Sequence, residues 1–142
     1  MMMGTIYVAG PVIRPGLANR RFRSVFHDVV TAADATGEKV VLPELDRSLD
    51  RLKPPDFVKL ISDRIASADG VLTVLTEGDQ SAPVEATLAA ICQKPQLVLA
   101  KNTKRVPRMI RGLPFVVDVV KFGDRPKLVQ GIRKLSKQYS GG

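Results

Sequence analysis

The sequence predicts an α/β protein: a single doubly wound sheet of five parallel strands flanked by helices. Short apolar and β-branched runs alternate along the chain with longer segments whose apolar residues recur at helical spacing, as in residues 56–68. The run at residues 71–75 is apolar or β-branched throughout, as expected of a strand that is covered on both faces. Strands that alternate with helices pair in parallel through right-handed crossovers.

The length and composition indicate one domain. We expect residues 1–142 to form it, since a chain of this length can bury a sizeable core and shows no internal repeat or linker. Cys92 is the only cysteine, which excludes an internal disulfide and a cysteine metal cluster. The start lacks the pattern of a signal peptide, and no run approaches the ~18–20 apolar residues of a membrane span. We therefore expect a cytoplasmic protein without a membrane partner.

The first strand and helix are predicted at residues 5–9 and 17–35. Gly10 and Pro11 end the strand, and apolar side chains recur at helical spacing in the helix. Arg20 and neighbouring arginines lie near the helix start, where the helix dipole does not favour cations. They either face an anion or form a solvated surface.

The remaining elements continue the alternation. We predict strands at residues 39–42, 71–75, 95–100 and 114–120, and helices at residues 56–68, 81–93, 109–112 and 127–139. Five parallel strands in this arrangement predict a flavodoxin-like fold. The segment after the first strand has neither a GxGxxG fingerprint nor a P-loop, which argues against an NAD-dependent dehydrogenase and a P-loop NTPase.

Glu85 is the strongest candidate for chemistry. It is expected in the first turn of the helix that follows the strand at 71–75, at the sheet edge where open α/β sheets bind ligands. Ser81 can cap that helix, whose dipole would keep the carboxylate ionised, as a nucleophile at a sugar carbon requires. The dipole alone also favours glutamate near a helix start by roughly 0.3–1 kcal/mol, so position alone leaves both interpretations open.

Four short motifs, taken in chain order, resemble one family. They are residues 6–11 (IYVAGP), Asp63 followed by residues 68–71 (ADGV), residues 79–85 (DQSAPVE) and residues 109–112 (MIRG). Together they are similar to the motifs of the nucleoside 2-deoxyribosyltransferase family and its relatives, the deoxynucleoside monophosphate N-glycosidases. This resemblance implies cleavage or transfer of an N-glycosidic bond on a (deoxy)nucleoside or nucleoside monophosphate, without a cofactor or a metal.

The resemblance also implies roles for individual residues. Glu85 would be the nucleophile, Tyr7 would orient it, and Asp69 would bind the base and pass a proton to its leaving nitrogen. A second set would bind substrate: Gly10, Pro11, Arg20, Asp79, Ser81, Arg108 and Met109. Family members complete each site with a neighbouring subunit, which implies a homodimer or higher homo-oligomer in which Arg108 and Met109 cross over.

The signals for a 5′-phosphate conflict. The formal charge of +8 favours an anionic partner, although a basic surface can also serve solubility alone. The monophosphate N-glycosidases tend to carry serine at the position of Asp79. The negative charge of an aspartate there would repel a 5′-phosphate, which favours a nucleoside-like ligand. The hydroxyl of Ser81 could still bind a phosphate.

Two alternatives to catalysis remain. Where the family has Gly-Thr or a similar small pair, this chain has Ser81 and Ala82 followed by Pro83, which suggests a module that binds a nucleotide without cleaving it. Basic residues near Lys101 and in the terminal helix suggest a nucleic-acid binder. With two Tyr, five Phe and no Trp, little is available for base stacking, so nucleic acid is the weakest alternative.

Overall fold

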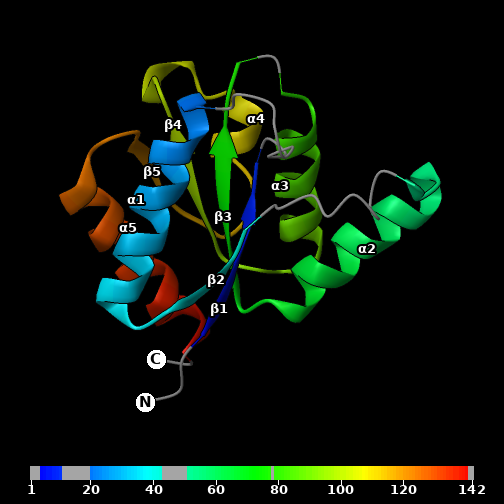
Figure 1. The fold of residues 1–142 in the computed structure, drawn as a ribbon, viewed down its shortest axis with the longest axis horizontal. Coiled ribbons are helices and arrows are strands. Elements are labelled where there is room, and N and C mark those ends of the chain that lie inside the picture. The colour runs from blue at the N-terminus through cyan, green and yellow to red at the C-terminus, as the bar shows by residue number, and fades with distance from the viewer. Residues whose placement is uncertain (1–3, 11–19, 43–50, 78, 141–142) are drawn as a thin grey trace.

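The computed structural model describes residues 4–10, 20–42, 51–77 and 79–140. Its five strands form one parallel sheet in the order β2-β1-β3-β4-β5. The strands are β1 (Thr5–Ala9), β2 (Lys39–Val41), β3 (Gly70–Leu75), β4 (Gln96–Ala100) and β5 (Val116–Lys121). The predicted fold class is therefore confirmed: the chain is a flavodoxin-like α/β protein (Figure 1).

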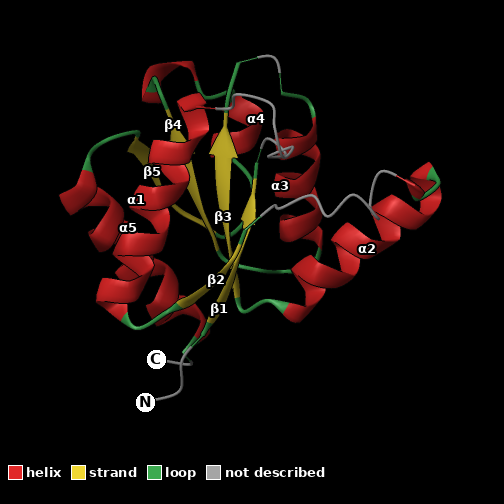
Figure 2. Cartoon of the chain, in the orientation of Figure 1, coloured by secondary structure: helices red, strands yellow, loops and turns green. Residues whose placement is uncertain are grey.

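Helices cover both faces of this sheet. They are α1 (Arg20–Thr36), α2 (Pro54–Ser67), α3 (Ser81–Ile91), α4 (Arg108–Arg111) and α5 (Arg125–Tyr139), with the 3-10 turn η2 (Thr103–Arg105) before α4. Figure 2 shows α1 and α5 on one side of the sheet and α2 and α3 on the other. Of the helices in the described segments, none is both long and apolar enough to cross a membrane.

The start of α2 differs from the prediction. The sequence predicts a helix from residue 56, but α2 begins two residues earlier, at Pro54 and Pro55. Proline lacks an N–H group, and the first turn of a helix has no intrahelical partner for one, so the two prolines fit there without loss. Pro11 and residues 17–19 of the predicted first helix lie outside the described residues.

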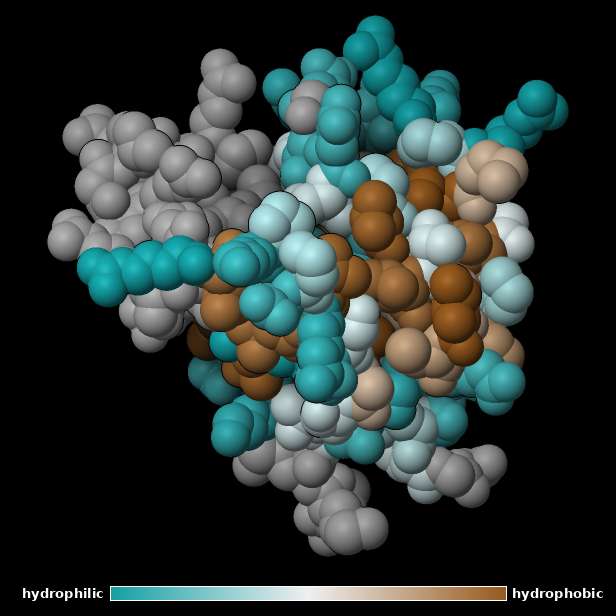
Figure 3. All heavy atoms as spheres, turned by 90° about the vertical axis from the view of Figure 1, so that its right-hand side faces the viewer, coloured by the Kyte–Doolittle hydropathy of each residue, from teal (hydrophilic) through white to brown (hydrophobic). Residues whose placement is uncertain are grey.

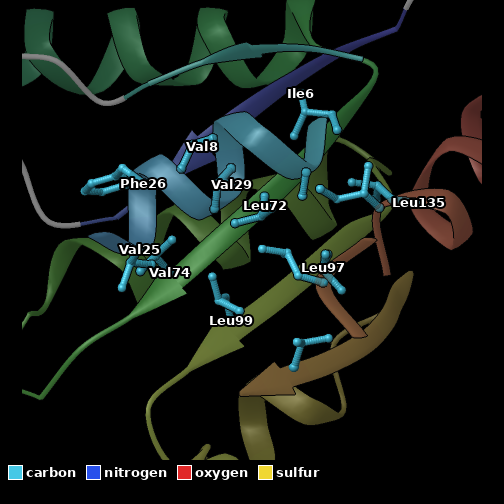
Figure 4. Packing of buried hydrophobic residues seen from close by; sticks show 14 residues of the cluster. Ile6, Val8, Val25, Phe26, Val29, Leu72, Val74, Leu97, Leu99 and Leu135 are labelled. Atoms are coloured by element: carbon cyan, nitrogen blue, oxygen red, sulfur yellow. The ribbon is translucent and has the colours of Figure 1, made fainter. Parts of the chain in front are cut away.

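The core has two layers, one on each face of the sheet. On the α1 and α5 face, side chains from β1, β3 and β4 interdigitate with the two helices (Figure 4). Among the side chains that form this layer are Ile6, Val8, Val29, Leu72, Leu97, Leu99 and Leu135. Because successive residues of a strand point to opposite faces, Tyr7 of β1 points into the other layer, where it packs with Ile65 of α2 and Ala89 of α3.

A buried polar network ties α3 to the sheet. The Gln96 side chain donates from Nε2 to the carbonyl oxygen of Ala86 at 3.0 Å and accepts from the Thr73 hydroxyl at 3.0 Å. Gln96 and Thr73 are fully buried, and burying an amide is favourable only when its hydrogen bonds are made. The network therefore holds the helix at Ala86, the residue that follows Glu85.

We predict that Gln96→Leu lowers the free energy of unfolding by roughly 1–3 kcal/mol, because it leaves the buried Thr73 hydroxyl without its partner. The double variant Gln96→Leu/Thr73→Val should regain part of that loss, since it removes both polar groups together. Chemical denaturation of the wild type and the variants measures the effect. A double variant less stable than Gln96→Leu alone would contradict it.

Candidate active site

Tyr7 and Glu85 meet in the apolar layer between the sheet, α2 and α3. The Tyr7 hydroxyl donates a hydrogen bond of 2.8 Å to Oε2 of Glu85, across 78 residues of sequence. Both side chains are buried, with 2% of Tyr7 and 8% of Glu85 exposed. The structure thus brings together the two residues that the sequence motifs placed in one site.

Two local features produce this contact. The alternation of β1 points Tyr7 toward α3, and the network through Gln96 holds α3 against the sheet one residue beyond Glu85. Glu85 is the fifth residue of α3, so it lies just past the first turn in which it was expected. The influence of the helix dipole falls off within that turn.

Burial dominates the electrostatics of the pair. It raises the pKa of the Glu85 carboxyl from about 4.5 to about 7, the negative charge of Asp79 acts in the same direction, and the Tyr7 hydrogen bond opposes them. Burial, followed by the charge of Glu85, raises the pKa of the Tyr7 phenol well above its ordinary value. The expected effect of the helix dipole, which favours an ionised Glu85, is therefore opposed by the loss of solvation, and the raised pKa leaves the carboxyl only partly ionised at neutral pH.

The turn before α3 is held by Asp79. Its Oδ1 accepts from the Ser81 amide at 3.0 Å and from the Ser81 hydroxyl at 2.8 Å. Ser81 was expected to cap the helix, but it is the first residue of α3, and Gln80 occupies the cap position without a side-chain hydrogen bond. Asp79 Oδ2 is buried and has no hydrogen-bond partner among the described residues, so a carboxylate oxygen next to Glu85 is left for another group.

Asp69 does not join this pair. It directly precedes β3, at the amino end of the strand, and its Oδ2 accepts from the backbone amide of Thr5 at 2.8 Å. Glu85 follows the carboxyl end of the same strand. The expected position of Asp69 beside a leaving base is therefore wrong, because the length of β3 separates the two carboxylates.

The other predicted substrate-binding residues are placed as follows. Gly10 follows β1, and a Cβ there would approach the Val74 side chain to 3.1 Å, so the position favours glycine for packing. Arg20 begins α1, and Pro11 lies outside the described residues. Arg108 and Met109 are exposed on α4, Met109 to 83%.

A cleft of about 850 Å³ opens at the carboxyl edge of β3, β4 and β5. Asp79 and Pro83 line it, and they lie six and two residues before Glu85. Glu85 itself does not line the cleft. In the described part of the chain, His, Cys, Asp and Glu do not gather into a group of three that could hold a metal ion.

Sequence reasoning missed three residues around the pair. Arg64, in the last turn of α2, lowers the pKa of Tyr7 through its positive charge, and its spacing from Ile61 and Ala68 places it on the helix face that packs toward Tyr7. Thr73 and Gln96 hold α3 in place. Their signal in the sequence is a polar residue within an otherwise apolar strand.

No protein-family model matches the chain, and no curated protein matches it. Several solved structures, however, are similar to the chain. A CMP N-glycosidase, BcmB, from Clostridium botulinum has a TM-score of 0.62 at 14% identity, covering 91% of this chain and 97% of that chain. A 2-deoxyribosyltransferase from Bacillus psychrosaccharolyticus has a TM-score of 0.64 at 16% identity, covering 88% and 90%.

A conserved protein from Enterococcus faecalis V583 has a TM-score of 0.69 at 16% identity, and the match covers 94% of this chain and 99% of that chain. At these identities the likeness establishes the fold. The structural neighbours include an N-glycosidase and a deoxyribosyltransferase, the two kinds of enzyme that the sequence motifs resemble.

We predict opposite shifts of the Glu85 pKa in two variants. Tyr7→Phe removes a hydrogen bond that favours the ionised carboxylate, so the pKa of Glu85 should rise above about 7. Asp79→Asn removes a negative charge and should lower it, while the asparagine oxygen can still accept from Ser81. Carbon-13 NMR titration of the Glu85 carboxyl measures both, with Asp34→Ala on α1 as the control. Shifts in the same direction would contradict this electrostatic account.

Proposed function

We propose that this protein cleaves or transfers the N-glycosidic bond of a (deoxy)nucleoside or nucleoside monophosphate, with Glu85 as the nucleophile. The observation that carries the proposal is the 2.8 Å hydrogen bond from Tyr7 to the buried Glu85 carboxylate. A phenol that holds one carboxylate oxygen leaves the other free and oriented for attack on an anomeric carbon. The names of two structural neighbours, a CMP N-glycosidase and a 2-deoxyribosyltransferase, support the substrate class.

The reaction would follow the two-step logic of retaining carboxylate glycosidases. A Glu85 oxygen forms a bond to the anomeric carbon while the carbon–nitrogen bond breaks, and the electron pair of that bond leaves with the base. The base nitrogen takes a proton from water. Water or a second base then attacks the anomeric carbon and loses a proton to the solvent, the ester bond to Glu85 breaks, and the carboxylate is restored.

The environment of Glu85 supports a functional role. The salt bridges found in the described segments do not include Glu85, and its pKa of about 7 leaves it partly ionised at neutral pH. A buried carboxyl with a strongly raised pKa at the ligand-binding edge of an α/β sheet is a typical active-site candidate. Since Asp69 lies at the other end of β3, Asp79 is the carboxylate that could hold the base, because its Oδ2 has no partner in the described structure.

We predict that the wild type releases free base from deoxynucleosides or deoxynucleoside monophosphates, and that Glu85→Ala lowers the rate by about three or more decades, the scale for a removed nucleophile. Chromatography of the free base measures both. Asp34→Ala, which removes an exposed carboxylate on α1, is the matched control and should keep the wild-type rate. Equal rates in the wild type and Glu85→Ala would overturn the assignment.

A second candidate is a module that binds a nucleotide without cleaving it. One observation favours it: Glu85 does not line the cleft, whereas Asp79 and Pro83 do. The same incubation separates the two functions, because a binding module would retain the intact nucleotide and release no base.

We also propose that two copies of the chain complete the site. Figure 3 shows apolar side chains gathered over the α2 and α3 side of the molecule. The exposed large apolar residues include Val58, Val84, Ile91 and Met109, and α3 is apolar around most of its circumference, as is typical of a helix that is covered on several sides. An exposed apolar surface of this kind marks an interface.

We predict that the wild type is a dimer or larger oligomer by light scattering. Ile91→Glu, at a position that is 72% exposed, should shift it to the monomer and lower the rate of base release. Thr31→Glu, which adds a charge at an exposed position of α1 on the other side of the sheet, tests whether any added charge has this effect. A monomeric wild type would contradict the shared site.

A further inference from the structure

The cleft at the carboxyl edge is larger than a single sugar needs. Its volume of about 850 Å³ lies at the upper end of the range for small-molecule sites, roughly 300–1,000 Å³. It extends away from Asp79 and Pro83 toward the ends of β4 and β5, and Lys101, Asn102 and Lys121 line that far part. A ligand with its sugar beside Asp79 and Pro83 would therefore have room to continue toward the ends of β4 and β5.

The charges of the cleft are unevenly paired. Two of its acidic residues are neutralised: Glu77 accepts from Arg105 at 3.1 Å, and Asp28 accepts from Arg125 at 3.2 Å. Lys101 and Lys121 are exposed and form no ion pair with the described residues. The cleft thus carries a negative charge at the start of α3, through Asp79, and positive charges at its far end, where β4 and β5 end.

Sheet register places the two lysines at the ends of neighbouring strands, and both line the cleft. Ala100, the last residue of β4, pairs with Lys121, the last residue of β5, and Lys101 follows Ala100 directly. Asn102 uses its side-chain oxygen to accept from the Lys104 amide at 3.1 Å, which leaves its amino group as a donor. Two ammonium groups and an amide donor at one sheet edge are suited to an anion with several oxygens.

We propose that this far end of the cleft is an anion subsite for the distal phosphates of a nucleoside di- or triphosphate, held by Lys101 and Lys121. The proposal rests on the proposed function, because it assumes that the sugar lies near Glu85. A 5′-phosphate close to the sugar would meet the negative charge of Asp79, whereas phosphates further along the chain reach the lysines. The subsite would thereby select a nucleotide with more than one phosphate.

The test measures binding to Glu85→Gln by calorimetry at low salt, so that no substrate is consumed. The ligands are the four common deoxynucleosides and their 5′ mono-, di- and triphosphates. Affinity should rise by about tenfold or more from the monophosphate to the triphosphate, and adding Lys101→Ala/Lys121→Ala should abolish that rise. The control adds Lys59→Ala/Lys137→Ala, which removes two exposed lysines of α2 and α5 that do not line the cleft.

Four outcomes bear on the subsite. Loss of the phosphate-dependent rise in the Lys101/Lys121 variant alone, together with displacement of the triphosphate by inorganic pyrophosphate, would support it. An equal rise in both double variants, no binding of any nucleotide, or simultaneous binding of pyrophosphate and triphosphate would overturn it. Since the readout is affinity, a failed subsite leaves base release by the wild type unchanged, and a failed glycosidase assay leaves this measurement intact.

Discussion

One hydrogen bond, from the Tyr7 hydroxyl to the Glu85 carboxylate, joins the first strand to the third helix inside an apolar layer. The burial that makes this contact strong also raises the pKa of Glu85 from about 4.5 to about 7. A carboxyl whose pKa is raised by folding stabilises the fold fully below its unfolded value, and that contribution is lost as pH rises through about 7. At neutral pH the fold thus holds a partly charged group where an apolar one would be more stable, as is common at functional sites.

The carboxylates that the structure places at the two edges of the sheet differ in their hydrogen bonding. At the amino edge, Asp69 accepts from the Thr5 amide and Glu38 accepts from the Gly4 amide and the Ser136 hydroxyl, so these carboxylates bind the chain to itself. At the carboxyl edge, Asp79 keeps a buried oxygen without a partner in the described structure. Carboxylates that accept hydrogen bonds from the chain itself stabilise the fold, whereas a carboxylate oxygen without a partner can accept one from a ligand. The carboxyl edge is where sheets of this type bind ligands.

Most of the elements could be predicted from the sequence, because apolar residues recur with the period of a strand or a helix. The errors have local causes. The start of α2 was predicted two residues late because proline usually ends a helix. In the first turn of a helix the N–H group that proline lacks has no intrahelical partner, so Pro54 and Pro55 are tolerated there. Asp69 was assigned to the site from a motif, although its position before a parallel strand already placed it at the amino edge. The Tyr7–Glu85 contact could be anticipated only through the resemblance, because nothing local links residues 78 positions apart.

By itself, the sequence determined the α/β class and placed Glu85 just beyond the carboxyl end of a buried strand, because both follow from local periodicity and the order of elements. Tertiary structure decided which groups meet. The pairing of β1 with β3 places Tyr7 beside Glu85, and burial rather than the helix dipole raises the pKa of that carboxyl. Among the described residues, long-range ion pairs occupy Arg105 and Arg125 and leave Lys101 and Lys121 as positive charges of the cleft without an ion pair. These results depend on solvation and on contacts between distant segments, neither of which a local pattern contains.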